Sequence, residues 1–171
     1  GGRGFGEPVR ASIDLDGTVP IVAFLRAAAA QRLLVAASDG RGFVVPAAEV
    51  VAETRKGKTV MTPRIGARLM LVRPVGAADD YVAVIGDNRK LAVFPIGELP
   101  EMTRGQGVQL QRYRDGGLAD ARTLVFADGL SWAMGGASGR VRTEADLTPW
   151  RTARGAAGRM APTGFPRDNR F

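Results

Sequence analysis

A combination of arginine with glycine recurs four times in this chain of 171 residues, and its spacing limits the fold more than any other feature. The leading arginines are Arg3, Arg55, Arg104 and Arg154, which lie 52, 49 and 50 residues apart. In the first three copies a valine follows four to six positions later, so each basic segment leads into a strand-like stretch. A period of about 50 residues is typical of propeller-like folds, in which each repeat forms one blade.

A second motif shares this period. Residues 39–41 (DGR), 87–89 (DNR) and 138–140 (SGR) are turn tripeptides of the kind that permits positive φ, and their arginines lie 48 and 51 residues apart. Apolar runs typical of β-strands precede and follow each turn. Each repeat therefore consists of a hairpin, an acidic residue, a basic glycine-rich loop and the next strand.

The repeats predict an all-β, propeller-like fold with about three blades of roughly 50 residues. We expect the blades at residues 9–58, 60–107 and 108–160, followed by a tail at 161–171 that packs on the last blade or extends from it. No segment has the length and composition of a linker, so we expect a single domain. The chain begins at Gly1 without a methionine, and we expect it to be part of a longer protein.

One segment has the composition of a helix. Residues 21–37 include four consecutive alanines and have high helix propensity. Their counterpart one repeat later, residues 70–85, contains Pro74 and Gly76 between apolar runs, which predicts strand, loop and strand. By analogy we expect residues 26–31 to form a connecting turn between strands.

The charge balance favours a polyanionic partner. The formal net charge is +7, and of the 24 basic residues only Lys56, Lys58 and Lys90 are lysines. Guanidinium groups match phosphate oxygens two at a time, although a GC-rich genome would produce the same bias towards arginine. Cysteine and histidine are absent, which excludes disulfides, thiolate or imidazole metal ligands and histidine-based triads. No apolar run is long enough to span a membrane, so we expect a cytoplasmic protein.

Candidate catalytic groups have simpler interpretations. Residues 52–59 fall one glycine short of a P-loop and lead into a strand, and the paired carboxylates at 14–16 and 79–80 lie in turns. Glu49, Glu98 and Asp146 repeat with the blades, which favours a structural role such as capping a turn or pairing with an arginine. We therefore expect no catalytic site, metal or cofactor in this chain.

The aromatic residues indicate packing rather than chemistry. Tyr81 opens an apolar strand, and Tyr113 lies between two arginines without the acidic metal cluster that strand cleavage would need. Trp132 and Trp150 occur only in the last repeat, and we expect both in the core rather than at a base-stacking surface.

Three segments together resemble a known family. Residues 38–61, 86–110 and 164–171 are similar to the β-pinwheel domains at the C-termini of the A subunits of gyrase and topoisomerase IV. Gyrase carries a seven-residue basic box, QRRGGKG, whereas the four segments here are degenerate versions of it, which favours the topoisomerase IV branch. The equivalent gyrase domain is the alternative. A family pinwheel has five or six blades, so three would form an incomplete set.

The resemblance implies a non-catalytic domain that binds and bends double-stranded DNA along its outer edge and presents it to the cleavage core. It implies that the cleavage tyrosine, the Mg and ATP sites and the B subunit belong to other parts of a nucleoid-associated type II topoisomerase. The residues that match the basic hairpin turns and degenerate boxes, and are therefore predicted to contact DNA, are Arg3, Arg41, Arg55, Lys56, Lys58, Arg89, Lys90, Arg104, Arg140, Arg142, Arg154 and Arg159.

A second hypothesis remains open from the residues themselves. The same basic rim on a propeller-like scaffold would bind an acidic regulatory protein, or would simply be a solvated surface. A glycosidase-type propeller enzyme is a weaker third hypothesis, because the chain lacks a convincing carboxylate pair.

Overall fold

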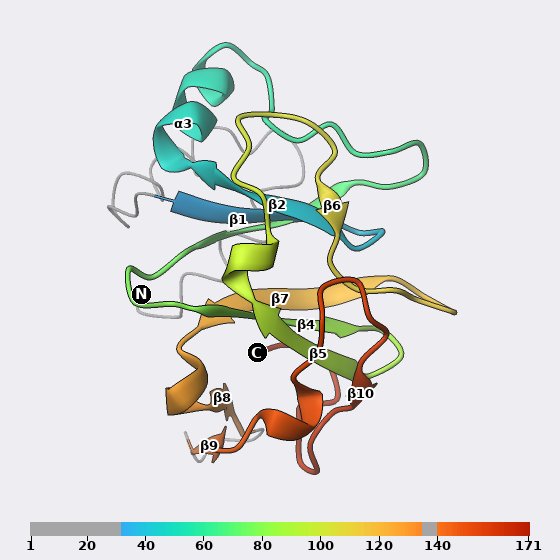
Figure 1. The fold of residues 1–171 in the computed structure, drawn as a ribbon. Helices are drawn as coiled ribbons and strands as arrows, with labels where there is room; N and C mark the ends of the chain where they lie inside the picture. The colour runs from blue at the N-terminus through green and yellow to red at the C-terminus, as the bar shows by residue number, and fades with distance from the viewer. Residues whose placement is uncertain (1–31, 135–139) are drawn as a thin grey trace. The chain divides into compact units, whose positions relative to one another are not determined.

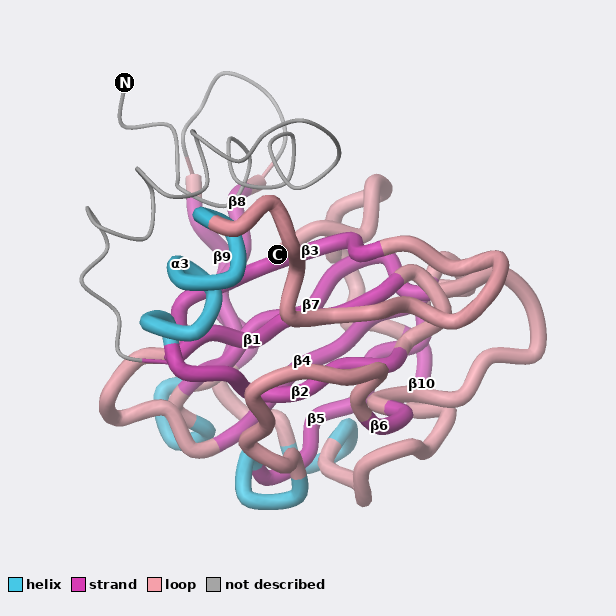
Figure 2. The backbone as a smooth tube through the Cα atoms, turned by 90° about the horizontal axis from the view of Figure 1, so that it is seen from above, coloured by secondary structure: helices cyan, strands magenta, loops and turns pink. Residues whose placement is uncertain are grey.

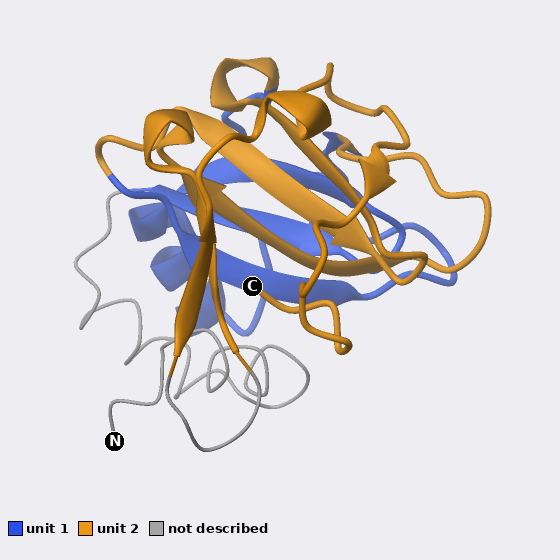
Figure 3. Ribbon diagram, turned by 90° about the horizontal axis from the view of Figure 1, so that it is seen from below, with its two compact units in different colours: residues 1–76, 99–108 blue, residues 77–98, 109–171 orange. Residues whose placement is uncertain are grey.

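The computed structural model describes residues 32–134 and 140–171, which fall into two compact units (Figure 3). Unit 1 comprises residues 1–76 and 99–108, and unit 2 comprises residues 77–98 and 109–171. Strands and loops account for most of the described chain, and its helical segments are short (Figure 2). The all-β expectation is confirmed.

The sheet of unit 1 has the strand order β3-β1-β2-β6, with β1 at Arg32–Ala37, β2 at Arg41–Pro46, β3 at Leu69–Pro74 and β6 at Val108–Gln109. The antiparallel hairpin β1-β2 pairs Leu33 with Val45 and Val35 with Phe43. Both strands are runs of apolar and β-branched residues, and successive side chains are buried, so both faces of the hairpin are covered.

Unit 2 repeats this sheet (Figure 1). Its strand order is β10-β5-β4-β7, with β4 at Tyr81–Gly86, β5 at Lys90–Pro95, β7 at Leu118–Leu124 and β10 at Arg159–Met160. A separate hairpin pairs β8, Leu130–Ala133, with β9, Val141–Glu144. In both four-stranded sheets the central hairpin pairs with a strand that follows it in sequence. The range 60–107, expected as one blade, therefore contributes strands to both sheets.

The first three strands of the two sheets correspond with an offset of 49 residues, and this offset corrects the alignment of the hairpin turns. The backbone N–H of Arg41 donates to Asp39 Oδ1 at 3.2 Å, and that of Lys90 donates to Asn88 Oδ1 at 3.0 Å. The preceding residues share positive φ, 89° at Gly40 and 64° at Arg89. The sequence-based match of Arg41 with Arg89 is therefore wrong by one residue, and Lys90 takes the place of Arg41.

One helix departs from the expected pattern. Helix α3, Ala47–Arg55, follows β2 directly, whereas the corresponding segment of unit 2 forms only the 3-10 turn Ile96–Glu98. The helical sequence AAEVVAETR begins with strong helix formers after Pro46 and carries Glu49 in its first turn, where the helix dipole favours a carboxylate. In unit 2, Gly97 and Pro100 oppose a longer helix.

The strand, loop and strand expected at residues 70–85 are confirmed as β3, a loop and β4. In the earlier repeat, the described part of residues 21–37 is strand β1. The connecting turn expected at 26–31 lies outside the described residues. Trp132 is 2% exposed in the core of unit 2, as expected, and half-buried Trp150 packs against the same cluster. The C-terminal segment closes this core, because Phe165 meets Trp132 and Phe171 edge-on at 5.2 and 5.6 Å between ring centroids.

Candidate nucleic-acid interface

In each unit, the basic box lies directly against the second strand of the central hairpin. Gly107 ends the box of unit 1 with φ +77°, and a Cβ placed there would lie 2.5 Å from the carbonyl oxygen of Gly42. Gly158 does the same in unit 2 with φ +85°, 2.4 Å from the carbonyl oxygen of Leu91. Only glycine permits both the backbone conformation and the close approach. The repeated glycine therefore fixes the box beside the hairpin turn.

Hydrogen bonds secure the same junction. Arg41 Nη1 donates to the carbonyl oxygen of Gly107 at 3.4 Å. In unit 2 the fully buried Gln111 donates through Nε2 to the carbonyl oxygens of Lys90, at 2.8 Å, and Ala157, at 3.0 Å. In each unit, hydrogen bonds therefore join the hairpin turn, with Arg41 or Lys90, and the box that follows it into one continuous edge.

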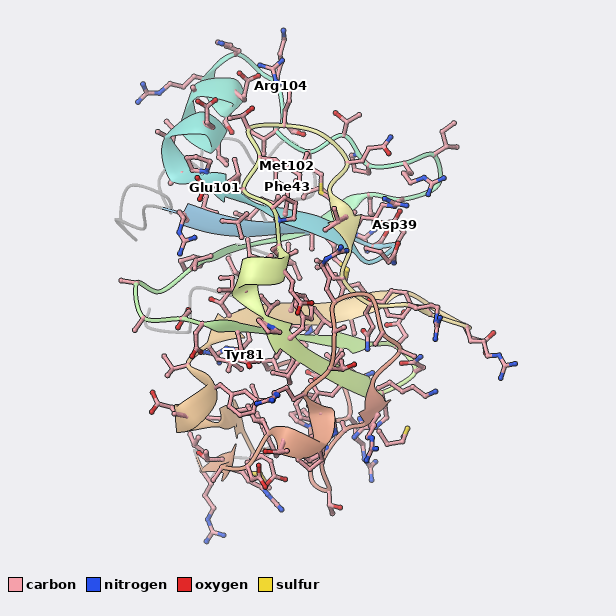
Figure 4. The ribbon with its side chains drawn as sticks, viewed as in Figure 1. Asp39, Phe43, Tyr81, Glu101, Met102 and Arg104 are labelled. Atoms are coloured by element: carbon pink, nitrogen blue, oxygen red, sulfur yellow. The ribbon has the colours of Figure 1, made fainter. Side chains whose placement is uncertain are left out.

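The basic residues of unit 1 continue this edge towards α3. Arg55, Lys56 and Lys58 are exposed at the C-terminal end of α3, where the helix dipole favours cations, and Lys56 Nζ lies 3.5 Å from Glu53 Oε1. Exposed Arg104 lies toward the same end of the unit, whereas Asp39 lies at the β1-β2 turn (Figure 4). Arg55, Lys56, Lys58 and Arg104 are thus exposed, whereas Arg41 is half-buried beside the box.

Arg89, a predicted DNA contact, directs both terminal nitrogens of its guanidinium at acceptors within unit 2. Arg89 donates through Nη1 to the carbonyl oxygen of Pro166 and to Asn169 Oδ1, both at 2.9 Å, and through Nη2 to the carbonyl oxygen of Phe165 at 3.1 Å. These bonds hold the C-terminal segment against the β4-β5 turn. The guanidinium of Arg89 is thereby engaged inside unit 2.

Arg154 is engaged in a similar way. Its guanidinium donates to the carbonyl oxygens of Glu98, at 2.9 Å, and Gln109, at 2.8 Å, while its backbone N–H donates to Glu98 Oε1 at 2.7 Å. The structural role expected for Glu98 is confirmed. Asp146 caps the 3-10 turn Thr148–Trp150, and hydrogen bonds from the hydroxyl and N–H groups of Thr148 lower the pKa of this carboxyl.

The remaining predicted residues of unit 2 are Lys90, which is half-buried, and Arg140, Arg142 and Arg159, which are exposed. Arg3 lies outside the described residues.

Two arginines of this surface are not among the predicted contacts. Arg112 and Arg114 line a pocket of about 350 Å³ together with Asn88, Lys90, Tyr113 and Ala157, so that three cations and no carboxylate surround it. Sequence offers one signal for them: Arg64 and Arg114 lie 50 residues apart, each shortly after a basic box. The backbone explains the placement, because Arg112 N donates to the carbonyl oxygen of Ala156 in the box at 3.3 Å.

The other groups considered for chemistry take part in packing and turns. Tyr81 packs against Phe126 with 4.5 Å between the centroids of the two tilted rings, which confirms its packed position. The carboxylate of Asp79 accepts from the hydroxyl of Thr123, and that of Asp80 accepts from the N–H of Phe126. Within residues 32–134 and 140–171, no three acidic side chains gather in a way that could hold a metal ion. No helix in this part of the chain is long and apolar enough to cross a membrane.

Known proteins share the two repeats seen in this chain. The family described as "DNA gyrase C-terminal domain, beta-propeller" matches residues 31–68 and 80–118, which are the two repeats with their offset of 49. The chain is 41% identical to the A subunit of DNA topoisomerase 4 from Rickettsia bellii and 40% identical to its counterpart from Caulobacter vibrioides, covering 99% of this chain and 22% of each relative. The chain belongs to the gyrase A C-terminal domain family. It spans about a fifth of the length of these curated relatives.

Solved structures of the gyrase A C-terminal domain family agree in fold. The Escherichia coli ParC C-terminal domain superposes with a TM-score of 0.63 at 26% identity, covering 81% of this chain and 58% of that domain. A gyrase A C-terminal domain, 14% identical, superposes with a TM-score of 0.59 over 78% of this chain and 48% of its own length, which shows the shared fold alone. The pinwheel expectation and the resemblance to the A subunits of topoisomerase IV are confirmed.

Proposed function

We propose that this chain is the duplex-DNA-binding part of a topoisomerase IV A subunit and that it holds DNA by its phosphates. The observation that carries the proposal is the repeated edge, in which a glycine locks a basic box against a cationic hairpin turn in both units. A topoisomerase must act on DNA of any sequence, and contacts to phosphates position a duplex without selecting its bases.

The pocket around Lys90 supplies the strongest local site. Lys90 approaches it from β5 and Arg112 and Arg114 from the loop before β7, and none of its lining residues is acidic. Guanidinium groups offer paired donors to phosphate oxygens, and the ammonium of Lys90 adds a compact charge. The ring of Tyr113 provides an apolar wall against which a deoxyribose would pack. This pocket is therefore suited to one backbone phosphate and its sugar.

The recurrence of the edge supports bending. Each unit carries such an edge, with Arg41 and Arg104 in unit 1 and Lys90 in unit 2, and each added phosphate contact would offset part of the cost of deforming the duplex. DNA cleavage, its magnesium and ATP requirements and the B-subunit contact would belong to the remainder of the parent type II topoisomerase. The parent would act in the cytoplasm on the nucleoid.

Binding to two unrelated 30-base-pair duplexes tests the proposal. Removing charge by Lys90→Ala together with Arg114→Ala should weaken binding to both duplexes about equally, by roughly ten-fold, because neither residue reads bases. Arg32→Ala is the matched control, since Arg32 lies at the opposite end of β1 from the turn and is 3.8 Å from Glu101 Oε1. A loss confined to one sequence, or an equal loss in the control, would contradict phosphate binding at this edge.

A further inference from the structure

An isoleucine projects into solvent from the loop that connects α3 to β3. Ile65 has a relative exposure of 107%, so its side chain has no cover from the rest of the described chain. It lies between exposed Arg64 and the positive-φ Gly66, in a tight turn closed by the bond from Ala67 N to the carbonyl oxygen of Arg64. Arg68, also exposed, follows the turn.

The second half of this loop, residues 62–68, is hydrogen-bonded at both of its ends to the proposed DNA-binding edge. At its start, Thr62 N donates to the carbonyl oxygen of Gly105 in the basic box at 2.9 Å. At its end, Ser38 in the hairpin turn donates to the carbonyl oxygen of Arg68 at 2.8 Å and accepts from Arg68 N through Oγ at 3.0 Å. This part of the loop therefore bridges the box and the hairpin turn through hydrogen bonds.

Unit 2 builds the same loop with a different tip. Residues 112–117 begin at the box, through the bond from Arg112 N to Ala156, and end at the hairpin turn, where Gly117 N donates to Asp87 Oδ2 at 3.1 Å. The positive-φ glycine recurs as Gly116, but Asp115 precedes it in place of an isoleucine. The loop thus forms with a charged tip, and its conformation does not require the hydrophobic side chain of Ile65.

We propose that Ile65 is a wedge that enters the minor groove of the bound duplex and partly unstacks one base step, while Arg64 and Arg68 contact the flanking phosphates. Proteins that kink DNA insert apolar side chains between base pairs in this way, and the cost of unstacking is least at flexible pyrimidine-purine steps. The inference rests on the proposed function and adds to it a localised kink and a preference for deformable sequence.

The test uses a duplex with a central TA step that carries 2-aminopurine, and a matched A-tract duplex. Fluorescence of the 2-aminopurine reports unstacking, energy transfer between the duplex ends reports bending, and anisotropy reports affinity. The wild-type protein should brighten the 2-aminopurine, shorten the end-to-end distance and prefer the TA duplex by about three- to ten-fold, since the stiff A-tract resists the kink.

Two variants, Ile65→Ala and Ile65→Asp, should abolish both the 2-aminopurine signal and the preference for the TA duplex; the aspartate copies the residue that unit 2 has at this position. Ile65→Ala should bind the A-tract duplex as tightly as the wild type. Val141→Ala is the control, because Val141 is 66% exposed but lies in β9. Retention of the signal in Ile65→Ala, or an equal loss of affinity for both duplexes, would overturn the wedge and leave phosphate binding intact. A wild-type protein that binds neither duplex would overturn the proposed function as well.

Discussion

Arg89 donates a hydrogen bond to the side-chain Oδ1 of Asn169 at 2.9 Å, and this bond joins the β4-β5 turn to the C-terminal segment. Two further bonds from the same guanidinium reach the carbonyl oxygens of Phe165 and Pro166. Phe165 in turn packs against Trp132 in the core of unit 2. Arg89, which has a φ of 64° in the hairpin turn, therefore helps to hold the segment that covers the hydrophobic core.

Replacing Arg89 tests this role. Arg89→Ala should lower the free energy of unfolding by about 2 kcal/mol, because three charge-assisted hydrogen bonds are lost. Arg89→Gly should recover about 1 kcal/mol of that loss, since glycine relieves the positive φ. Urea unfolding followed by tryptophan fluorescence measures both. Equal stability of wild type and Arg89→Ala would show that these bonds contribute nothing.

Gly158 should tolerate no side chain. Gly158→Ala would place a Cβ 2.4 Å from the carbonyl oxygen of Leu91 and should destabilise unit 2 by about 2–4 kcal/mol. Gly57→Ala shares a positive φ but has open space around it, so it should lose only about 1 kcal/mol. Chemical denaturation of the two variants separates the steric clash from the backbone strain. Similar losses in both would argue against the close packing of box on hairpin.

Some of the structural features behind these predictions can be predicted from the sequence, and others cannot. The hairpins are predictable because apolar β-type runs and a turn tripeptide are local signals, and the repeat supplies their pairing. Helix α3 is not, because the weaker helix signal of its counterpart, broken by Gly97 and Pro100, hides it when the repeats are compared. The turn register is misaligned because arginine rarely adopts positive φ, so that Arg89 matches Arg41 in sequence but Gly40 in structure.

The candidate site shows the same limit. Recurrence identifies Lys90 and the glycines of the boxes but not Arg112, because Thr62 makes the corresponding backbone bond in unit 1 and breaks the pattern of charge. The engagement of Arg154 depends on carbonyl groups brought close only by the tertiary fold. Local sequence therefore does not show whether an arginine faces solvent or donates to a carbonyl group, because the acceptor comes from a distant part of the chain.

Arg154 and Arg112 should therefore respond differently to substitution. Arg154→Ala should lower the free energy of unfolding by about 1–3 kcal/mol and leave the salt dependence of DNA binding unchanged, since its donors already have acceptors. Arg112→Ala should leave stability within about 0.5 kcal/mol, as for other exposed side chains, and weaken DNA binding. Urea denaturation measures the stability of each variant, and fluorescence anisotropy measures its affinity for DNA. The reverse pattern would show that Arg154, not Arg112, contacts the phosphates.

The cap at Asp146 should make a small contribution to stability that depends on pH. Hydrogen bonds from Thr148 place its folded pKa below the ordinary value of 3.8. The stabilisation is therefore fully present above that value and is lost as the pH falls through the folded pKa. Asp146→Asn should remove this part of the acid dependence while leaving the rest of the profile. Urea midpoints measured between neutral and strongly acidic pH compare the two proteins, and identical profiles would exclude the effect.

The salt dependence of binding to a duplex tests phosphate recognition most directly. Plots of log K against log salt concentration should be linear for the wild-type protein, with a slope of about −0.9 for each phosphate contact. Neutralising Lys90, Arg112 and Arg114 together should make that slope shallower by about 2 to 3, because each lost cation releases one counterion fewer. A wild-type affinity that barely changes with salt, or a triple variant with an unaltered slope, would contradict phosphate recognition by this surface.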